Sequence, residues 1–375
     1  MRSSLKDVAR EAGVSVATVS RHLNGSINLP EGTRKRVDDA VSKLSYRPNP
    51  HARRLSLGKS DSIALIVPDI ANPFFSSLAA SIELAAAEHG SMVVLHATFD
   101  RAQREVAALE MAIDNHMDGI IFMSNGEPDP RVTEIINQAA RVVVMDELVP
   151  GAQAPKLLCD NETGGFLAGR HLAEMGHRDV AYIGGSPRLA STAARLEGLR
   201  RGLASADGAS ANGDSAGEDS ASGAAAPEVR LFTGDHSVEA GRRLAERFLD
   251  QAERESALFV GSDELTIGVI EILKERGIAI PEELSLVSFD DARSLHLYDP
   301  PITAVRQPAR ALGRRAVELI FEGDWEAPGF RNSAEVLPVA LTKRASVAAL
   351  DNTPINNLSN NEERDATQGN KGGKT

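Results

Sequence analysis

The chain has 375 residues, a formal net charge of −12 from 41 Lys and Arg against 53 Asp and Glu, and one cysteine, Cys159. This length predicts two or three domains, and a hydrophobic content of 42% excludes wholesale disorder. A single cysteine excludes a disulfide framework and a cysteine-cluster zinc site. No apolar run approaches the ~20 residues of a membrane span, and the N-terminus lacks the apolar core of a signal peptide. We therefore expect a cytoplasmic protein with no membrane partner.

The charge is unevenly distributed along the chain. Residues 1–60 contain twelve Lys and Arg and five Asp and Glu, which gives +7, so the remaining residues carry −19. Attraction to phosphate decays over roughly a Debye length, ~8–10 Å in physiological salt, so a local basic region can bind DNA although the whole chain is acidic. A solvated charged surface is the alternative interpretation. If the basic region does bind DNA, repulsion of the acidic remainder confines contact to that region.

The basic region begins with two predicted helices. Ser4 and Asp7 have the spacing of a capping box, and the apolar residues that follow lie on one helical face. Gly13 can end this helix, because glycine accepts the left-handed conformation without a Cβ penalty. Ser15 can then cap a second helix over Val16–Leu23, which Asn24 and Gly25 end. Two short helices joined by a three-residue turn with glycine form the helix-turn-helix pattern.

A third amphipathic stretch, Thr33–Leu44, would supply the core that two short helices cannot build alone. In a helix-turn-helix the second helix enters the major groove by its N-terminal end. We therefore expect Val16, Ala17 and Arg21 near the base edges, with Ser15, Thr18 and Ser20 available for phosphates. Arg21 could donate two hydrogen bonds to guanine, and the two aliphatic side chains offer methyl contacts to thymine. A three-helix interaction module without DNA is the alternative.

These residues resemble the LacI/GalR family of bacterial transcription regulators. The matching motifs are Leu5–Arg21, Thr33-Arg34, Leu44–Asn49 and Ala52–Leu55, and the similarity continues to about Val347. The Val16-Ala17 pair resembles galactose-repressor-type members, which bears on the operator sequence. The resemblance implies a helix-turn-helix DNA-binding domain at 1–47, a hinge helix and linker at 48–60, and a two-lobed effector-binding and dimerisation domain at 61–347.

The segment between head and body is predicted to be a conditional helix. Pro48 and Pro50 interrupt the preceding helix, and Pro50–Leu57 is too short to be stable as an isolated helix in water. The resemblance implies that two such hinge helices pair in the minor groove of the operator. Asn49 and Arg53 would then contact DNA, and Leu55 matches the leucine that wedges into the central base step. A plain tether with an incidental leucine is the alternative.

From residue 62 short aliphatic runs alternate with amphipathic stretches. The predicted strands are Ile63–Val67, Met92–His96, Gly119–Met123, Val142–Met145, Leu157–Cys159, Val180–Ile183, Leu231–Thr233, Leu258–Val260 and Leu284–Phe289. The predicted helices lie near 75–89, 102–115, 162–175, 192–203, 238–250 and 264–276. This alternation predicts an α/β core of two doubly wound lobes, the periplasmic-binding-protein-like architecture, following the all-α head. The lobes should be a structural duplication, and ligands should bind beyond the C-terminal strand ends, between the lobes.

Polar and aromatic residues follow the predicted strands and give the candidate effector site. The candidates are Asp69, Asn72, Phe74, Phe75, Asp160, Ser191, Arg195, His236, Asp263 and Asp290, with Asp146, Asn161 and Ser262 in similar positions. Carboxylates, amides and an arginine beside aromatic rings suit a polyhydroxylated ligand. His236 stands where relatives often have an aromatic residue and Ser262 where some have asparagine, so the identity of the sugar stays open. The aspartates could instead be helix caps or turn residues, and the phenylalanines could be core.

The sequence offers little evidence of a catalytic motif. Gly164–Gly169 lacks the spacing of a dinucleotide-binding fingerprint, and no phosphate-binding loop, nucleophile elbow or zinc-protease motif occurs. His171 and His177 are six residues apart, so they share no helical face for a metal, and we interpret them as surface histidines. We therefore predict a protein that is not an enzyme and has no metal and no cofactor.

Two segments lack the composition of a packed domain. Residues 204–227 contain nine Ala, five Ser and four Gly, so they cannot bury enough apolar area to offset chain entropy, and we predict a disordered insertion. Residues 351–375 are polar and rich in Asn, and they lack the heptad leucines that some relatives use to form tetramers, and the predicted tail spans 348–375. A disordered tail and a dimer are therefore expected.

The leading hypothesis is a homodimeric repressor of carbohydrate-utilisation genes. Its partners would be a double-stranded, pseudo-palindromic DNA operator and a small sugar or sugar derivative, and it would associate with the nucleoid when bound to the operator. The alternative is a solute-binding protein of a transport system, against which the absent signal peptide and the basic head count. A sugar-processing enzyme is a third hypothesis, weakened by the missing catalytic motifs. Whether the effector induces or co-represses does not follow from the sequence.

Overall fold

The chain is represented by a computed structural model that describes residues 3–46, 60–124, 126, 129–205 and 229–350. The predictions for the hinge helix, for most of the 204–227 insertion and for the tail from residue 351 lie outside these residues. The chain divides into two compact units, residues 1–160 with 308–338 and residues 161–307 with 339–375. It therefore crosses between the units three times. No helix in the described ranges is long and apolar enough to span a membrane.

Residues 3–46 form the predicted three-helix head. The helices are α1 (Leu5–Ala12), α2 (Val16–Leu23) and α3 (Glu31–Lys43). The capping box between Ser4 and Asp7 is present, and Gly13 ends α1 with a left-handed φ of 66°, as predicted. The buried side chains of the head are Val8, Ala9, Ala12, Val19, Val37 and Ala40, contributed by all three helices. The third helix begins two residues earlier than predicted, directly after Pro30.

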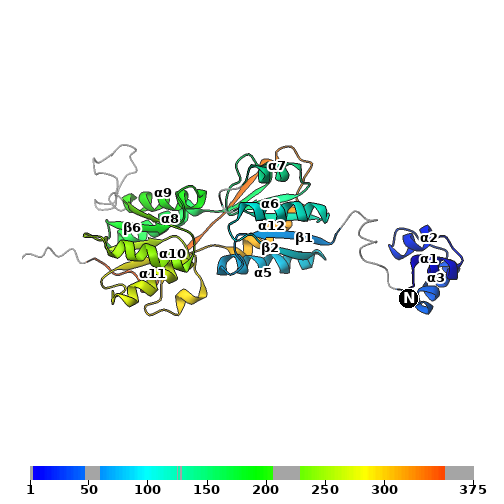
Figure 1. Cartoon of the computed structure of the whole chain (residues 1–375), viewed down its shortest axis with the longest axis horizontal. Helices are drawn as coiled ribbons and strands as arrows, with labels where there is room; N and C mark the ends of the chain where they lie inside the picture. The colour runs from blue at the N-terminus through cyan, green and yellow to red at the C-terminus, as the bar shows by residue number, and fades with distance from the viewer. Residues whose placement is uncertain (1–2, 47–59, 125, 127–128, 206–228, 351–375) are drawn as a thin grey trace, which may run out of the picture. The chain divides into compact units, whose positions relative to one another are not determined.

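The first unit contains a six-stranded parallel sheet in the order β11-β5-β4-β3-β1-β2. Its strands are β1 (Ser62–Val67), β2 (Met92–Ala97), β3 (Gly119–Met123), β4 (Val142–Met145), β5 (Lys156–Cys159) and β11 (Ala334–Leu337). Side chains of β1, β3 and β4 that point to one face form a core with α6 (Ala102–Asp114) and α7 (Pro130–Gln138). The helices α5 (Pro73–Glu88) and α12 (Ala309–Glu322) pack on one another and on the sheet (Figure 1).

The second unit repeats this arrangement. Its sheet has the order β12-β10-β9-β8-β6-β7 and is parallel except for β12. The strands are β6 (Val180–Gly184), β7 (Val229–Thr233), β8 (Ala257–Val260), β9 (Ser285–Phe289), β10 (Thr303–Arg306) and β12 (Ala340–Thr342). The helices are α8 (Asn161–Glu174), α9 (Ala190–Ser205), α10 (Val238–Leu249) and α11 (Asp263–Glu275).

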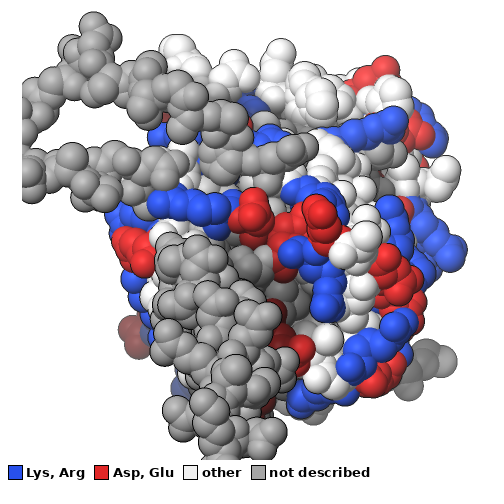
Figure 2. Space-filling model, turned by 90° about the vertical axis from the view of Figure 1, so that its left-hand side faces the viewer, with Lys and Arg blue, Asp and Glu red and all other residues white. Residues whose placement is uncertain are grey.

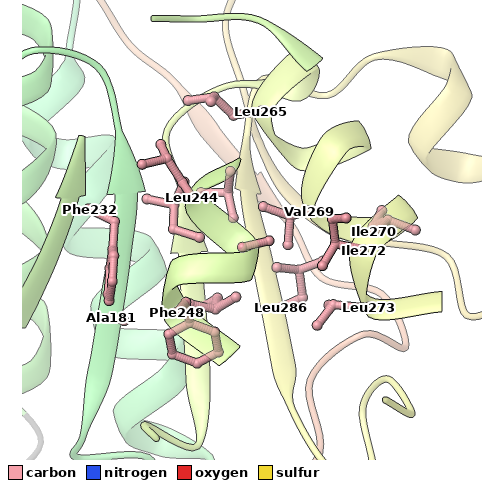
Figure 3. Close-up of a cluster of buried hydrophobic side chains, with 14 of the residues drawn as sticks. Ala181, Phe232, Leu244, Phe248, Leu265, Val269, Ile270, Ile272, Leu273 and Leu286 are labelled. Carbon is pink, nitrogen blue, oxygen red and sulfur yellow. The ribbon is translucent and has the colours of Figure 1, made fainter. Parts of the chain in front are cut away.

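Alternate strand residues of the second unit face two separate cores. Ala181 and Leu286 contribute to a core with α10 and α11, in which Leu244 and Phe248 of α10 lie near Val269 of α11 (Figure 3). The intervening strand residues point to the opposite face of the sheet and form a second core with α8 and α9, on the other face of β6 (Figure 1). Helices therefore cover both faces of the sheet, as the sequence pattern predicts for buried aliphatic strands.

The two units share one topology, which confirms the predicted structural duplication. The order β2-β1-β3-β4-β5 in the first sheet corresponds to β7-β6-β8-β9-β10 in the second. The chain leaves the first unit after β5 and enters α8, and it leaves the second unit after β10 and enters α12. The correspondence extends to backbone detail, because Asp146 after β4 and Asp290 after β9 both have a positive φ, 66° and 69°.

The structure adds elements that the sequence analysis missed. These are α7, α12 and the short strands β10, β11 and β12. Helix α7 begins with Pro130 after the capping residue Asp129, which is a recognisable start signal, whereas α12 follows Pro308 without a side-chain cap. The three strands have only three or four residues each, too few to show a period.

The histidine interpretation was wrong, because His171 and His177 are both buried in the second unit. His177 makes ring hydrogen bonds with the Ser256 hydroxyl at 2.8 Å and with the Ala348 carbonyl at 3.0 Å. The Leu350 amide also donates to the Met175 carbonyl at 2.8 Å. The start of the predicted tail is therefore anchored on the second unit as far as residue 350.

Candidate functional sites

The N-terminal end of α2 forms an exposed surface on the head. The Ser15 hydroxyl accepts a hydrogen bond from the Thr18 amide at 3.0 Å, and the two hydroxyls lie 2.8 Å apart. Val16, Ala17 and Arg21 are exposed, whereas Val19 on the opposite side is fully buried. The apolar side chain of Val16 is 40% exposed. The exposed face of α2 thus consists of the residues predicted to contact bases.

Polar pairs hold the helices of the head in place. His22, near the end of α2, lies 3.0 Å from the Asp38 carboxylate of α3. Lys43 of α3 donates to Glu11 of α1 at 2.6 Å. Exposed pairs of this kind contribute less than about 1 kcal/mol each, so the buried core carries most of the stability of the head. The first pair links α2 to α3, and the second links α3 to α1.

Arg195 organises the C-terminal edge of the sheet in the second unit. Its side chain extends from α9 and is 5% exposed. Nε donates to Asn161 Oδ1 at the start of α8 at 2.8 Å, and Nη1 donates to the Gly261 carbonyl after β8 at 2.6 Å. The guanidinium lies 3.7 Å from the centre of the Phe289 ring at the end of β9. One cationic group therefore contacts residues from three separate elements.

Two buried carboxyl groups lie at the same edge. Burial, together with repulsion from Asp290, raises the pKa of Asp263 to about 7. Burial also raises the pKa of Asp290, although Arg195 and a 2.6 Å hydrogen bond from Gln307 Nε2 act in the opposite direction. Both carboxyl groups are therefore more easily protonated than an exposed aspartate.

His236 and Ser262 also lie at this edge, after β7 and β8. The ring of His236 packs against Gly185, where a Cβ atom would collide with Nε2. Shielding from water lowers the pKa of His236 to about 4, and the nearby Arg195 contributes to this shift, so the ring is uncharged at neutral pH. The Ser262 hydroxyl caps α11, accepting from the Leu265 amide at 3.4 Å. For α11, the capping role that the sequence left open for Asp263 therefore falls to Ser262.

The remaining candidates lie in the first unit. The Asn72 side chain caps α5 by accepting from the Phe74 amide at 2.8 Å, and Asp69 accepts from the Ala71 amide at 2.9 Å. Phe74 and Phe75 are half-buried, with their rings edge to face at 5.2 Å. A shallow, mostly apolar depression is lined by Phe74, Leu78, Met145, Asp146, Leu157, Cys159 and Leu312.

The predicted effector residues therefore form two groups. Ser191, Arg195, His236, Asp263 and Asp290 belong to the second unit, and Asp69, Asn72, Phe74, Phe75 and Asp160 belong to the first. Gln307 is a site residue that was not predicted, because it follows the four-residue strand β10, which is too short to show a period. The Gly261 carbonyl and the supporting ring of Phe289 were not predicted either. The predicted DNA contacts Asn49, Arg53 and Leu55 lie outside the described residues.

No group of three or more His, Cys, Asp or Glu that could hold a metal ion occurs in the part of the chain that the structure describes. Acidic and basic side chains are interspersed on the visible part of the face in Figure 2.

Comparison with known proteins places the chain in a family. Residues 4–49 match the domain described as bacterial regulatory proteins, lacI family, and residues 170–347 match the periplasmic binding protein-like domain. The chain is 32% identical to catabolite control protein A of Priestia megaterium, over 85% of this chain and 92% of that protein. It therefore belongs to the LacI family of bacterial regulatory proteins.

Two solved structures have the same fold. The lac repressor dimer bound to operator and the anti-inducer ONPF matches with a TM-score of 0.74 at 23% identity, over 93% of this chain and 100% of that one. The complex of the transcriptional regulator CelR with cellobiose matches with a TM-score of 0.63 at 27% identity, over 92% and 100%. The helix-turn-helix head and the two-lobed α/β core are thus confirmed.

Proposed function

We propose that the protein is a transcriptional repressor that binds a pseudo-palindromic operator as a homodimer and responds to a sugar-like effector. The observation that carries this proposal is the exposed face of α2, on which Val16, Ala17 and Arg21 are exposed, whereas Val19 packs into the core of the head. The function requires neither catalysis nor a cofactor, and its place is the cytoplasm, on the nucleoid when the operator is bound.

The chemistry of α2 specifies what it can read. Arg21 can donate two hydrogen bonds to guanine O6 and N7, which discriminates against other bases by ~1–3 kcal/mol. The methyl groups of Val16 and Ala17 fit the thymine methyl. Ser15, Thr18 and Ser20 supply hydroxyls for phosphates, which fix orientation without reading sequence. Because each head reads a few base pairs, two heads on a two-fold axis are needed for a specific site.

Selection from a pool of random duplex oligonucleotides tests the operator part of the proposal. We expect enrichment of an inverted repeat by the full chain. Arg21→Ala should relax one position in each half-site, whereas Lys35→Ala, which removes a charge from α3, should leave the selected sequence unchanged. Leu55→Ala should abolish tight binding while the fold is retained. A wild-type chain that enriches no sequence would contradict the proposal.

The edge of the second unit supports an uncharged, hydroxyl-rich effector. Asp263, Asp290 and Gln307 supply acceptor oxygens, and the Gln307 Oε1 atom is buried without a hydrogen-bond partner among the described residues. Arg195 supplies a cationic donor with an aromatic ring beneath it. Vicinal sugar hydroxyls both donate and accept, so they can satisfy carboxylate and guanidinium together. The cellobiose in the related CelR complex is a ligand of this class.

Thermal shift measurements with cellobiose, glucose and ribose, each beside its phosphorylated form, test the effector class. A free sugar should raise the melting temperature of the full chain, and its phosphate ester should not, because a dianion would face two acidic groups. Stabilisation by the phosphate esters alone would contradict this part of the proposal.

Regulation requires that the effector bind the operator-competent and operator-free states unequally, typically by 1–3 kcal/mol. The operator affinity measured with and without the stabilising sugar should therefore differ by about 5–150-fold, the factor equivalent to that free energy. A reporter gene under the selected operator then distinguishes repression from activation. Equal operator affinities with and without the sugar would mean that the sugar does not regulate DNA binding, and would contradict the proposal.

A further inference from the structure

The glycine-rich start of α8, the motif that does not fit a dinucleotide-binding loop, lies against α9 at unusually close range (Figure 1). A Cβ atom at Gly165 would collide with the Arg195 carbonyl oxygen, and one at Gly198 would collide with the Glu162 carbonyl oxygen. One turn further on, Gly169 and the α9 residue Gly202 repeat this contact. The backbones of α8 and α9 therefore touch directly, with no side chain between them.

This packing brings α8 up to the backbone of Arg195. Because Gly165 contacts the carbonyl of Arg195 itself, the separation of the two helices sets where the arginine side chain begins. The same approach brings Asn161, the first residue of α8, within 2.8 Å of Arg195 Nε. A larger residue at position 165 would move both ends of this hydrogen bond apart.

The neighbouring Gly164 acts on the other side of the arginine. A Cβ atom there would lie 2.6 Å from the Phe289 ring, closer than real Cβ contacts. The centre of that ring lies 3.7 Å from the Arg195 guanidinium. The ring also belongs to a row of three aromatic side chains, in which the ring centres of Phe289 and Phe259 are 6.4 Å apart and those of Phe259 and Tyr182 are 5.3 Å apart. Gly164 thus leaves the space in which the supporting ring lies.

We propose that Gly164 and Gly165 are positioning residues for Arg195, the first through the ring beneath the guanidinium and the second through the backbone of α9. The inference concerns the geometry of the side chain and needs no effector. Its consequence for effector affinity rests on the proposed function.

The position of Arg195 can be read by NMR on the full chain labelled with ¹⁵N-arginine. The Arg195 Nε–H resonance is the one lost in Arg195→Lys, and it should be shifted by the ring current of Phe289 and exchange slowly with water. In Gly164→Ala the ring must move, so we expect the resonance to lose its ring-current shift. In Gly165→Ala we expect the loss of slow exchange.

A matched control separates positioning from general destabilisation. Gly119→Ala creates a side-chain collision with Ile320 in the first unit, away from the α8–α9 pair. We expect this control to retain the Arg195 signal even where its melting temperature falls. If Gly165→Ala does not fold, Gly164→Ala decides alone, because it meets only side chains. An unmoved Arg195 resonance in Gly164→Ala would overturn the proposal.

The effector response is measured separately. The ligand is whichever of the free sugars cellobiose, glucose and ribose stabilises the wild type. Its thermal shift should fall by more than half in Gly164→Ala and be retained in Gly119→Ala. A full shift in Gly164→Ala would overturn the consequence for effector affinity, whereas the NMR result decides the positioning role. If none of these sugars stabilises the wild type, the proposed function fails, and the NMR result still decides the positioning role.

Discussion

Replacing Arg195 with alanine removes the group on which most of the second-unit edge depends. The variant loses a hydrogen bond to Asn161, another to the Gly261 carbonyl, and the stacking on Phe289. It also removes the cation that lowers the pKa of Asp290, so burial should raise that pKa further. We therefore expect both a loss of stability and a loss of any sugar-induced thermal shift.

The magnitude follows from these contacts. A hydrogen bond from a charged donor contributes ~1.5–3 kcal/mol, and a buried cation over an aromatic ring up to about 2 kcal/mol. The desolvation of the guanidinium opposes these terms, so they cannot simply be added. Breaking one side of a buried charged arrangement typically costs 3–5 kcal/mol. We expect the free energy of unfolding of the second unit to fall by about that amount.

Arg201→Ala is a matched control, since Arg201 lies on the same helix and pairs with Glu162 of α8 at an exposed position. Such a pair contributes at most about 1 kcal/mol. Urea unfolding can be followed by circular dichroism, which reports both units, and by the fluorescence of Trp325, the only tryptophan, which lies in the first unit. We expect Arg195→Ala to shift the circular dichroism transition to lower urea than the fluorescence transition. If both transitions of Arg195→Ala fall at the same urea concentrations as those of Arg201→Ala, the reasoning is refuted.

Three further predictions concern single groups. Ser15→Ala removes the cap of α2 and should cost about 1 kcal/mol locally, seen as roughly fivefold faster exchange of the Thr18 amide, whereas unchanged exchange would exclude the capping role. The folded state raises the pKa of Asp263, so it binds a proton that the unfolded chain releases, and this group's contribution falls as pH rises from about 4 to 7. In urea titrations, the free energy of unfolding of Asp263→Asn should therefore rise by about 2 kcal/mol relative to that of the wild type between pH 5 and pH 8. A difference between the two proteins that does not change with pH would contradict the pKa shift. Burial lowers the pKa of His171, whose ring nitrogens have no hydrogen-bond partner among the described residues. As the pH falls below ~6.5, His171 therefore binds a proton in the unfolded chain before it does so in the folded one, which destabilises the fold. In His171→Leu the melting temperature should fall less steeply on acidification than in the wild type, and an equally steep fall would contradict this prediction.

Local signals were sufficient to predict the head. Ser4, Gly13 and Ser15 fix the ends of the first two helices through contacts within a few residues, and the structure confirms all three. The same holds for strands whose residues are buried on both faces, because an aliphatic run such as Gly119–Met123 is visible without its neighbours. Elements of three or four residues carry no such period, which is why β10 and the site residue Gln307 after it were missed.

Long-range packing decided the burial of the histidines. The six-residue spacing between His171 and His177 indicates nothing about what covers them. The carbonyl that covers His177 belongs to Ala348, 171 positions further along the chain. The support of Arg195 has the same character. Asn161, Gly261 and Phe289 come from three elements up to 128 positions apart, and only the sheet order brings them to one guanidinium.

The sequence by itself determined the helix-turn-helix head, the alternation of strands and helices, and the residue types at the strand ends. These features depend on local backbone preferences and on hydrophobic periods, which a single chain segment already contains. The tertiary structure decided which carboxyl groups have a raised pKa, which histidines are shielded from water, and how closely Gly164 and Gly165 approach the Phe289 ring and the backbone of α9. Desolvation and steric exclusion depend on atoms contributed by distant segments, so they exist only once the chain has folded.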